Sequence, residues 1–369
     1  MAAADAVRSA LLERDSKTVA QIVNSYKYAA SIVSSVVSNG YLGMVKTIPQ
    51  MYRFIYARAE RATEVGPFRN WVHQFTATNL RSLIERTNPD IVICTHAFPC
   101  GVMSEYKKQF ADSPPVVGVV TDFAVHSFWI HRNIDGYAVA SDEMRATMIG
   151  RGIDPSRIIV SGIPVNASFV AKPMDRAVLR DELGMPQDRS AILLMGGGLG
   201  IGPLEMMMRA LNSVHQPVCA TVIAGRNKRL HQRVMEAAQG VQYPIRVLSF
   251  VDNVHDYMRA ADVLITKPGG LTSAEALVAG IPMVLVKPLP GQEERNTRYL
   301  VERKAALRAT NEHDLTRKVE EFLASPQRRK TMGAAIDRLA KPRAADDVAA
   351  LAQRLAAQKK ERTAVRALV

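Results

Sequence analysis

Short apolar runs alternate with amphipathic stretches along most of the chain. The runs are rich in Val and Ile, are almost unbroken in apolarity and mostly end on Gly, Ser, Thr or Asp, as strands buried on both faces do. They occupy residues 89–96, 115–122, 136–141, 157–162, 191–198, 219–225, 245–250, 261–267 and 281–287. Amphipathic stretches such as 203–214 and 272–280 predict helices between them. This alternation predicts an α/β fold with parallel sheets that carry helices on both faces.

The predicted strands fall into two sets, separated by a stretch over 162–189 that has three prolines and no strand pattern. We therefore predict one domain over 1–161 and a second over 162–340. The remaining residues, 341–369, are Ala-rich and predict a terminal helix with seven Lys or Arg against three Asp or Glu. A solvated basic helix is the simplest interpretation of that segment.

Composition narrows the function classes. The chain has 369 residues, a formal net charge of +13 and a pI of about 9.8, which favours phosphate-rich partners. Aromatic residues make up only 6% and no zinc-finger or RNA-binding motif is present, so nucleic acid is disfavoured. The three cysteines form no C-x-x-C pair, and no apolar run is long enough to span a bilayer. These features predict a cytoplasmic protein without a metal site.

A Lys-Pro-Gly-Gly turn lies between a predicted strand and a predicted helix in ITKPGGLTSAEAL, residues 265–277. Thr272 and Glu275 have the S/T-x-x-E spacing of a capping box, in which Glu275 would only bond the backbone at the helix start. Alternatively, the free N–H groups at the helix start hold a phosphate and Glu275 binds sugar hydroxyls. Loops at the carboxyl ends of parallel strands are where such folds bind ligands.

Two further connections have similar chemistry. LLMGGGLGIGPLEMMM, residues 193–208, runs from a strand through a glycine turn into a helix, but matches neither G-x-G-x-x-G nor a P-loop. KPLPGQEERNTRYL, residues 287–300, places amide and carboxylate groups at helical spacing after a Pro-Gly break. Two glycine turns that open helices in one domain favour an anion site there.

TKPGGLTSAEAL followed by PGQEERN resembles the donor site of the monogalactosyldiacylglycerol synthases and the processive diacylglycerol glucosyltransferases, relatives of MurG. Other segments agree in order and spacing over residues 85–310, among them VVTDFAVHSFWIH, GIDPSRIIVSGIPV, LLMGGG, AGRNKRL and SFVDNVHDYMRAADVLITK. MurG-like proteins have a different Gln-rich segment in place of PGQEERN, so the glycolipid enzymes are the preferred relatives.

The resemblance implies the GT-B fold, two Rossmann-like domains that face each other across a cleft, with a UDP-sugar bound by the C-terminal domain. Glu275 would bond the ribose, Phe250 and Val251 would flank the uracil, and Gln292, Glu293 and Asn296 would orient the sugar. The diphosphate would lie against Gly197, Gly198, Gly269, Gly270 and Thr272. It further implies an inverting transfer of a hexose to diacylglycerol, with no cofactor and no bound metal.

The resemblance also implies an acceptor side in the N-terminal domain. His96 and Asp122 end predicted strands and are the candidate catalytic bases, with His126 and His131 as further candidates. The segment 41–62 suits a basic interfacial helix on an anionic membrane, with Tyr52, Arg53, Phe54 and Ile55 as contact residues. A core helix is the alternative for that segment. The expected location is the inner face of the membrane, as a peripheral protein.

The chain departs from the family at its start. MAAADAVRSALLERD resembles the helix that follows the family's G-x-G-H-x-x-A-A motif, so the first strand and its His-bearing loop are expected to be missing from the N-terminal domain. Asn166 follows GIPV where relatives often have Arg. A start assigned too late or a lost acceptor element would each explain the first departure.

Two other functions remain compatible with the sequence. One is a UDP-sugar epimerase of the same fold, which needs no acceptor. The other is an inactive nucleotide-binding or lipid-binding relative. The residues leave glucose and galactose open as donor sugars, and they leave processivity and oligomeric state open.

Overall fold

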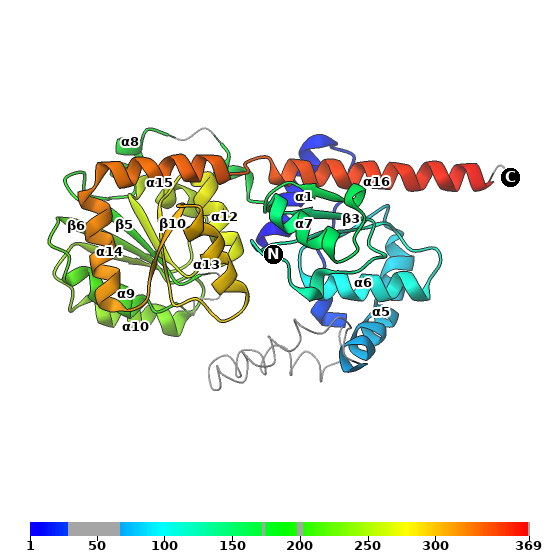
Figure 1. Cartoon of the computed structure of the whole chain (residues 1–369), viewed down its shortest axis with the longest axis horizontal. Coiled ribbons are helices and arrows are strands. Elements are labelled where there is room, and N and C mark those ends of the chain that lie inside the picture. Colours follow the sequence, from blue (N-terminus) through cyan, green and yellow to red (C-terminus); the bar gives the residue numbers. More distant parts are fainter. Residues whose placement is uncertain (29–66, 172–173, 198–201, 368–369) are drawn as a thin grey trace. The chain divides into compact units, whose positions relative to one another are not determined.

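The computed structural model describes residues 1–28, 67–171, 174–197 and 202–367, and the chain divides into two compact units (Figure 1). Unit 1 comprises Met1–Asn166, Pro290–Gln292 and Arg343–Val369, and unit 2 comprises Ala167–Leu289 and Glu293–Pro342. Unit 2 thus begins at Ala167, whereas the sequence predicted the domain boundary at residue 162. Each unit has its own sheet, and each is described here by itself.

The sheet of unit 1 is parallel, with strand order β1-β2-β3-β4. Its strands are β1 (Val92–Cys94), β2 (Val116–Val119), β3 (Gly136–Val139) and β4 (Ile158–Val160). Every residue of β2 and β3 is buried, because the two strands lie inside the sheet and both of their faces are covered. This explains the unbroken apolar runs in the sequence.

Two helices that are distant in the sequence cover one face of this sheet. They are α1 (Ala2–Arg14) and α16 (Ala344–Ala367), which pack against each other. Val7 of α1 and Val348 of α16 belong to one buried cluster with Val117 of β2. The terminal segment, expected as a separate basic helix, therefore contributes part of the core of unit 1.

Helix α6 (Ala97–Gln109) packs against β1 and β2. A Cβ added to Gly118 of β2 would lie 2.7 Å from the Tyr137 ring and 3.2 Å from Cys100 Sγ of α6, so only glycine fits there. Helix α5 packs against α6. The remaining elements of unit 1 are η1 (Ser25–Tyr28), α5 (Pro67–Thr87), η3 (Ser127–Trp129), α7 (Asp142–Gly150) and η4 (Pro155–Arg157).

The sheet of unit 2 is also parallel, with strand order β10-β9-β8-β5-β6-β7. Its strands are β5 (Ser190–Met195), β6 (Val218–Ile223), β7 (Ile245–Leu248), β8 (Val263–Thr266), β9 (Met283–Val286) and β10 (Ala306–Ala309). The chain runs outward from β5 to β7, then returns to β8 on the other side of β5 and continues to β10. The reversal of direction makes the space between β5 and β8 the topological switch point, where doubly wound sheets bind ligands.

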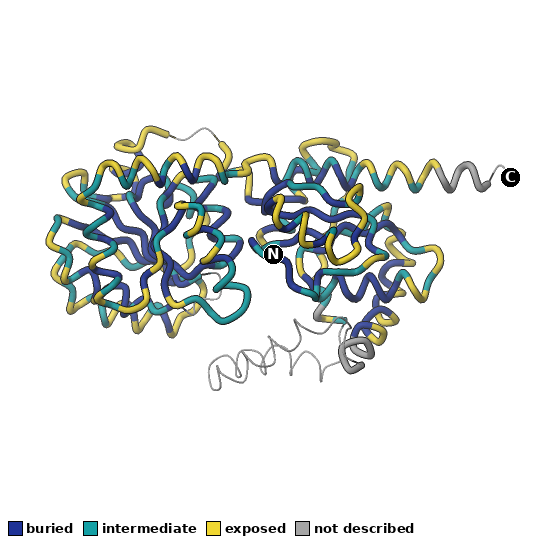
Figure 2. Tube along the Cα trace, in the orientation of Figure 1, coloured by how far each residue is buried: buried dark blue, intermediate teal, exposed yellow. Residues whose placement is uncertain are grey.

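Helices cover both faces of this second sheet. α9 packs against β5 and α10, while α11 packs against β5 and α12, and α14 contacts α9, β9 and β10. Figure 2 shows that the buried residues of unit 2 concentrate in its strands. The helices of this unit are η5 (Ala167–Phe169), α8 (Arg176–Glu182), α9 (Leu204–Asn212), α10 (Lys228–Ala238), α11 (Val254–Ala260), α12 (Gly270–Ala279), α13 (Gln292–Glu302), α14 (Glu312–Ala324) and α15 (Pro326–Leu339).

The predicted fold class is confirmed, and each of the nine predicted strands overlaps an observed one, with β5 and β6 beginning one residue earlier than predicted. Strand β10 was not predicted. Across the described ranges, no helix has the length and apolarity to cross a bilayer.

Candidate functional site

The two glycine connections predicted from the sequence leave the sheet side by side. β5 pairs with β8 in a register that sets Met195 opposite Thr266, the last residues of the two strands. Gly196 and Gly197 follow β5, while Lys267, Pro268 and Gly269 follow β8. The two connections therefore flank the switch point at the carboxyl edge of the sheet. Gly198 lies outside the described residues.

The backbone at Gly269 suggests why a Gly-Gly pair stands at the start of α12. It is the N-cap of α12 with ordinary extended backbone at φ −70° and ψ 138°, and a Cβ there would meet nothing within 4 Å. The fold of unit 2 therefore does not require glycine at this position. No side chain caps the helix start. A bare, open backbone at the positive end of a helix is what the close approach of an anion requires.

The capping-box interpretation of Thr272 and Glu275 is wrong. The helix begins at Gly270, so Thr272 lies inside the first turn, where it is buried. Glu275 lies one turn further on, is half-buried, and makes no hydrogen bond or ion pair within the described residues. Burial raises the pKa of Glu275 to about 7. A half-buried carboxylate without a partner is available to accept hydrogen bonds from hydroxyl groups.

The connection after β9 is bonded to the connection after β8. Lys267 Nζ lies 3.2 Å from Glu293 Oε2, and the buried Asn296 amide donates to the Pro268 carbonyl oxygen at 3.0 Å. Glu293 and Asn296 therefore support the Lys-Pro-Gly-Gly turn, and their predicted contact with a sugar remains a prediction. Sequence reasoning did not single out Lys267, because nothing in the local pattern shows that its side chain is buried.

Gln292 groups with unit 1. Its amide donates to Asp122 Oδ2 at 3.1 Å, so one predicted donor ligand and one predicted base are hydrogen-bonded within that unit.

Phe250 and Val251, predicted to flank a nucleobase, follow β7. Phe250 is 44% exposed, which is unusual for a large aromatic side chain. The Arg226 guanidinium carbon lies 3.5 Å from the centroid of the Phe250 ring. Arg226 follows β6, whose connection is joined to that of β7 through a hydrogen bond from Gly225 N to Ser249 O. Arg226 belongs to the AGRNKRL segment, but only its contact with Phe250 makes it a candidate site residue.

The predicted bases of unit 1 do not end their strands but lie in the connections after the neighbouring strands β1 and β2. His96 is the N-cap of α6, and its Nδ1 accepts a hydrogen bond from Phe98 N at 3.3 Å. The His96 side chain reaches solvent, but surrounding protein removes much of its hydration and lowers its pKa. Asp122 follows β2 and is half-buried. His126 is buried against aromatic rings, and the His131 side chain contacts the Phe128 carbonyl oxygen, so both have structural surroundings.

The predicted membrane-contact residues Tyr52, Arg53, Phe54 and Ile55 lie outside the described residues. Within the described ranges, no three His, Cys, Asp or Glu side chains are grouped as metal ligands.

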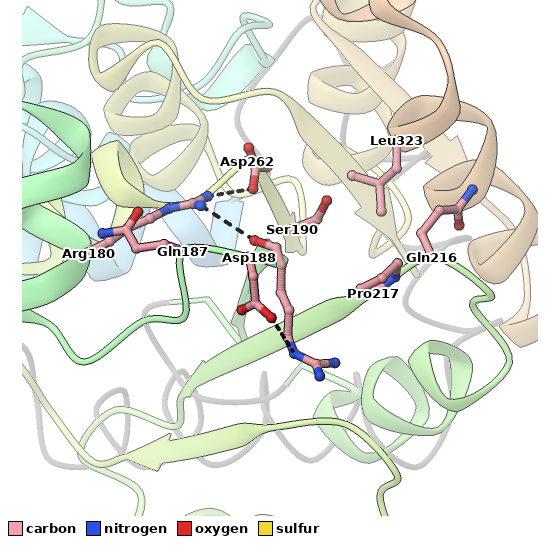
Figure 3. Close-up of a pocket in the computed structure, with 9 residues that line it drawn as sticks. Arg180, Gln187, Asp188, Ser190, Gln216, Pro217, Asp262 and Leu323 are labelled. Carbon is pink, nitrogen blue, oxygen red and sulfur yellow. Dashed lines mark hydrogen bonds and ion pairs between the residues drawn. The ribbon is translucent and has the colours of Figure 1, made fainter.

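A cavity of about 430 Å³ opens at the other end of the unit 2 sheet (Figure 3). Asp262, just before β8, accepts hydrogen bonds from Arg176 and Arg180 at 2.6 Å each and from the Ala191 backbone N–H at 2.7 Å. These contacts hold α8 to the start of β5 and β8. Because the cavity lies at the amino ends of the strands and its Arg180 and Asp262 side chains satisfy each other, we assign it a structural role.

Comparison with known proteins shows which families the chain is similar to. Residues 1–165 match the family described as monogalactosyldiacylglycerol (MGDG) synthase, and residues 191–348 match the glycosyltransferase family 28 C-terminal domain. A processive diacylglycerol β-glucosyltransferase from Bacillus mycoides (strain KBAB4) is 30% identical over 318 residues, which cover 86% of this chain and 81% of that protein. A protein of the same name from Bacillus cereus (strain AH187) has the same identity and coverage.

The chain belongs to the diacylglycerol glycosyltransferase family.

The predicted family is thereby confirmed. Solved structures show the GT-B fold of this diacylglycerol glycosyltransferase family member at lower identity. MurG from Acinetobacter baumannii is 18% identical, with a TM-score of 0.56 over 77% of this chain and 79% of that chain. UDP-GlcNAc 2-epimerase from Neisseria meningitidis, bound to UDP-GlcNAc, is 11% identical, with a TM-score of 0.56 over 79% and 84% of the two chains. These likenesses concern the fold alone.

Proposed function

We propose that this diacylglycerol glycosyltransferase family member transfers a hexose from a UDP-sugar to diacylglycerol, with inversion at the anomeric carbon and without a bound metal. The observation that carries the proposal is the open start of α12 at the switch point. There, Gly269 leaves the backbone accessible and Glu275 has no partner within the described residues. A nucleoside diphosphate needs both features, an anion site and an acceptor for sugar hydroxyls.

The donor would lie along the carboxyl edge of the unit 2 sheet. Its diphosphate would meet the start of α12 between Gly197 and Gly269, with Thr272 behind it. Glu275 would accept from the ribose hydroxyls, and the uracil would lie beside Phe250 and Val251. The hexose would lie toward the connection after β9. Helix-end N–H groups would stabilise the negative charge that develops on the leaving UDP.

Inversion follows from a single displacement, in which the lipid hydroxyl attacks the anomeric carbon from the side opposite UDP. The attack requires a base for the hydroxyl proton. Asp122 and His96 of unit 1 are the candidates. The lowered pKa of His96 leaves its ring neutral near pH 7, which a base requires. We further propose that the basic chain acts on the inner face of the membrane, because its net charge of +13 suits an anionic surface.

A transfer assay on liposomes tests the proposal. Purified protein is mixed with labelled UDP-glucose or UDP-galactose and vesicles with or without diacylglycerol. A labelled glycolipid formed only with diacylglycerol supports the proposal, and its anomeric configuration tests inversion. Activity that withstands EDTA supports a mechanism without metal.

Two results would replace the proposal. Interconversion of UDP-sugars in the absence of vesicles would indicate an epimerase. UDP binding with no turnover of any UDP-hexose would indicate a binding protein. Glu275→Ala is the matched inactive control, because it removes the carboxylate that the proposal assigns to the ribose.

A further inference from the structure

The connections after β8 and β9 are joined through one ion pair between a buried lysine and a half-buried glutamate. Lys267, the first residue beyond β8, is only 7% exposed, and its Nζ lies 3.2 Å from Glu293 Oε2 in the first turn of α13. Within the described residues this is the one ion pair of Lys267. The register of β8 and β9, with Thr266 opposite Leu285, brings both connections to the same edge of the sheet.

Glu293 Oε2 also accepts a hydrogen bond from the connection that leads into α13. The Leu289 backbone N–H donates to Glu293 Oε2 at 2.6 Å, and the Glu294 N–H donates to the Leu289 carbonyl at 3.2 Å. Within α13, the Glu293 carbonyl accepts from the Thr297 hydroxyl at 2.8 Å. Oε2 therefore has two donors, whereas Oε1 has none within the described residues.

A charged pair is an unusual choice for a purely structural contact at this place. A buried ion pair pays desolvation on both charges, and an apolar pair of similar volume is often equally stable. The Asn296–Pro268 hydrogen bond already ties the two connections. What the Lys267 ammonium adds is a fixed orientation of the Glu293 carboxylate. Oε2 is occupied by the Lys267 ammonium and the Leu289 N–H, which leaves Oε1 without a donor within the described residues.

We propose that Lys267 is a positioning residue, which orients Glu293 so that Oε1 accepts a hydrogen bond from a hydroxyl of the donor hexose. The inference rests on the proposed function and deepens it. It attributes the difference between the affinity for a UDP-hexose and the affinity for UDP to one ion pair. Lys267 itself touches neither the diphosphate nor the sugar. Its effect passes entirely through Glu293.

Binding measurements with UDP and with the UDP-hexose that the enzyme uses test this role. Lys267→Met leaves the Kd for UDP within about twofold, because UDP has no hexose. It lowers the affinity for the UDP-hexose and the kcat/KM for the donor by about 10- to 100-fold, the loss typical of one hydrogen bond to a charged group. Lys267→Arg, which keeps the charge, recovers most of the loss. Lys330→Met, an exposed lysine on α15, removes the same charge and is the matched control.

A double-mutant cycle decides whether Lys267 acts through Glu293. Glu293→Gln lowers the UDP-hexose affinity, and Lys267→Met combined with Glu293→Gln lowers it no further. The double variant removes both charges of the pair, so it provides a folded protein even where Lys267→Met alone leaves Glu293 without its partner. Thermal unfolding of each variant checks this.

The inference and the proposed function fail in different ways. Transfer by the wild type with an unaffected Lys267→Met variant overturns the inference alone, and so does additive loss in the double variant. Equal weakening of UDP and UDP-hexose by Lys267→Met places the ammonium on the diphosphate and overturns it too. If the wild type transfers nothing but binds UDP-hexose more tightly than UDP, and Lys267→Met abolishes that difference, the inference stands and the transferase proposal falls.

Discussion

The Arg226 guanidinium carbon lies over the Phe250 ring, 3.5 Å from its centroid, beyond the carboxyl ends of β6 and β7. The two residues come from separate strand–helix connections, so their stacking joins two loops of the proposed donor site. An exposed aromatic ring paired with an arginine offers a planar surface for a nucleobase.

Phe250→Ala is expected to weaken UDP binding by about two- to tenfold, the loss that corresponds to one aromatic stacking contact. The free energy of unfolding should change by no more than about 1 kcal/mol, because the ring is exposed. Calorimetric titration with UDP measures the first and denaturant unfolding the second. Met235→Ala removes another exposed apolar side chain, on α10, and should leave UDP binding unchanged. Equal UDP affinity for both variants would remove Phe250 from the site.

Gly269→Ala separates function from folding. The backbone angles suit alanine and the added methyl group meets no atom, so the free energy of unfolding should stay equal or rise by about 0.4–1 kcal/mol. The donor kcat/KM should fall by about 10- to 100-fold, because a Cβ displaces a closely bound phosphate. Gly333→Ala is the matched control, since a Cβ there also meets nothing and the position is inside α15. Full activity of Gly269→Ala would mean that no ligand approaches this backbone.

Glu275 should make the stability of the unliganded protein depend on pH. Burial raises its pKa from 4.5 to about 7, so the protonated form is the one that the fold favours. That contribution is complete below pH 4.5 and is lost as the pH rises through about 7. Glu275→Gln should therefore be more stable than the wild type at pH 8, by at most about 3 kcal/mol, with the difference vanishing near pH 4.5.

Denaturant unfolding at several pH values checks this prediction without ligand. Glu182→Gln, at an exposed position of α8, serves as the control for loss of a surface carboxylate. A stability difference between wild type and Glu275→Gln that does not change with pH would show that the carboxyl is not desolvated.

Asp262 should be important for stability and not for catalysis. Asp262→Asn removes the charge that faces the buried Arg180, so the free energy of unfolding should fall by about 3–5 kcal/mol. The transfer rate per folded molecule should stay near that of the wild type. Asp188→Asn, in the same cavity but exposed and 3.9 Å from Arg189, should change stability by less than about 1 kcal/mol. A loss of donor affinity in Asp262→Asn would contradict the structural role of this cavity.

The sequence predicted the strands of both sheets except β10, because the unbroken apolar runs of a parallel sheet carry their own signal. It did not predict β10, where ALRA is alanine-rich and has weak strand propensity. Ala306–Ala309 forms a strand because β9 offers a free edge in register, with Ala306 opposite Met283. The strand is thus decided by its neighbour.

In the candidate site, too, some features could be predicted from the sequence and others depend on contacts between distant segments. The spacing of Thr272 and Glu275 matched a capping box with Thr272 as N-cap, yet the observed N-cap is Gly269, three residues earlier. Lys267 resembles any lysine in the sequence until its burial against Glu293 is seen. Arg226 acquires a role only through Phe250, which is distant along the chain.

The sequence by itself determined the α/β class, the strand–glycine–helix connections and, through the ordered segments, the family. These depend on local patterns, because apolar runs and glycine turns encode elements without reference to distant residues. Only the tertiary structure decided that β5 and β8 are neighbours at the switch point, that Lys267 is paired with Glu293, and that Glu275 is half-buried without a partner in the described residues. Strand order, burial and charge pairing arise from contacts between segments far apart in the chain, and no local pattern specifies them.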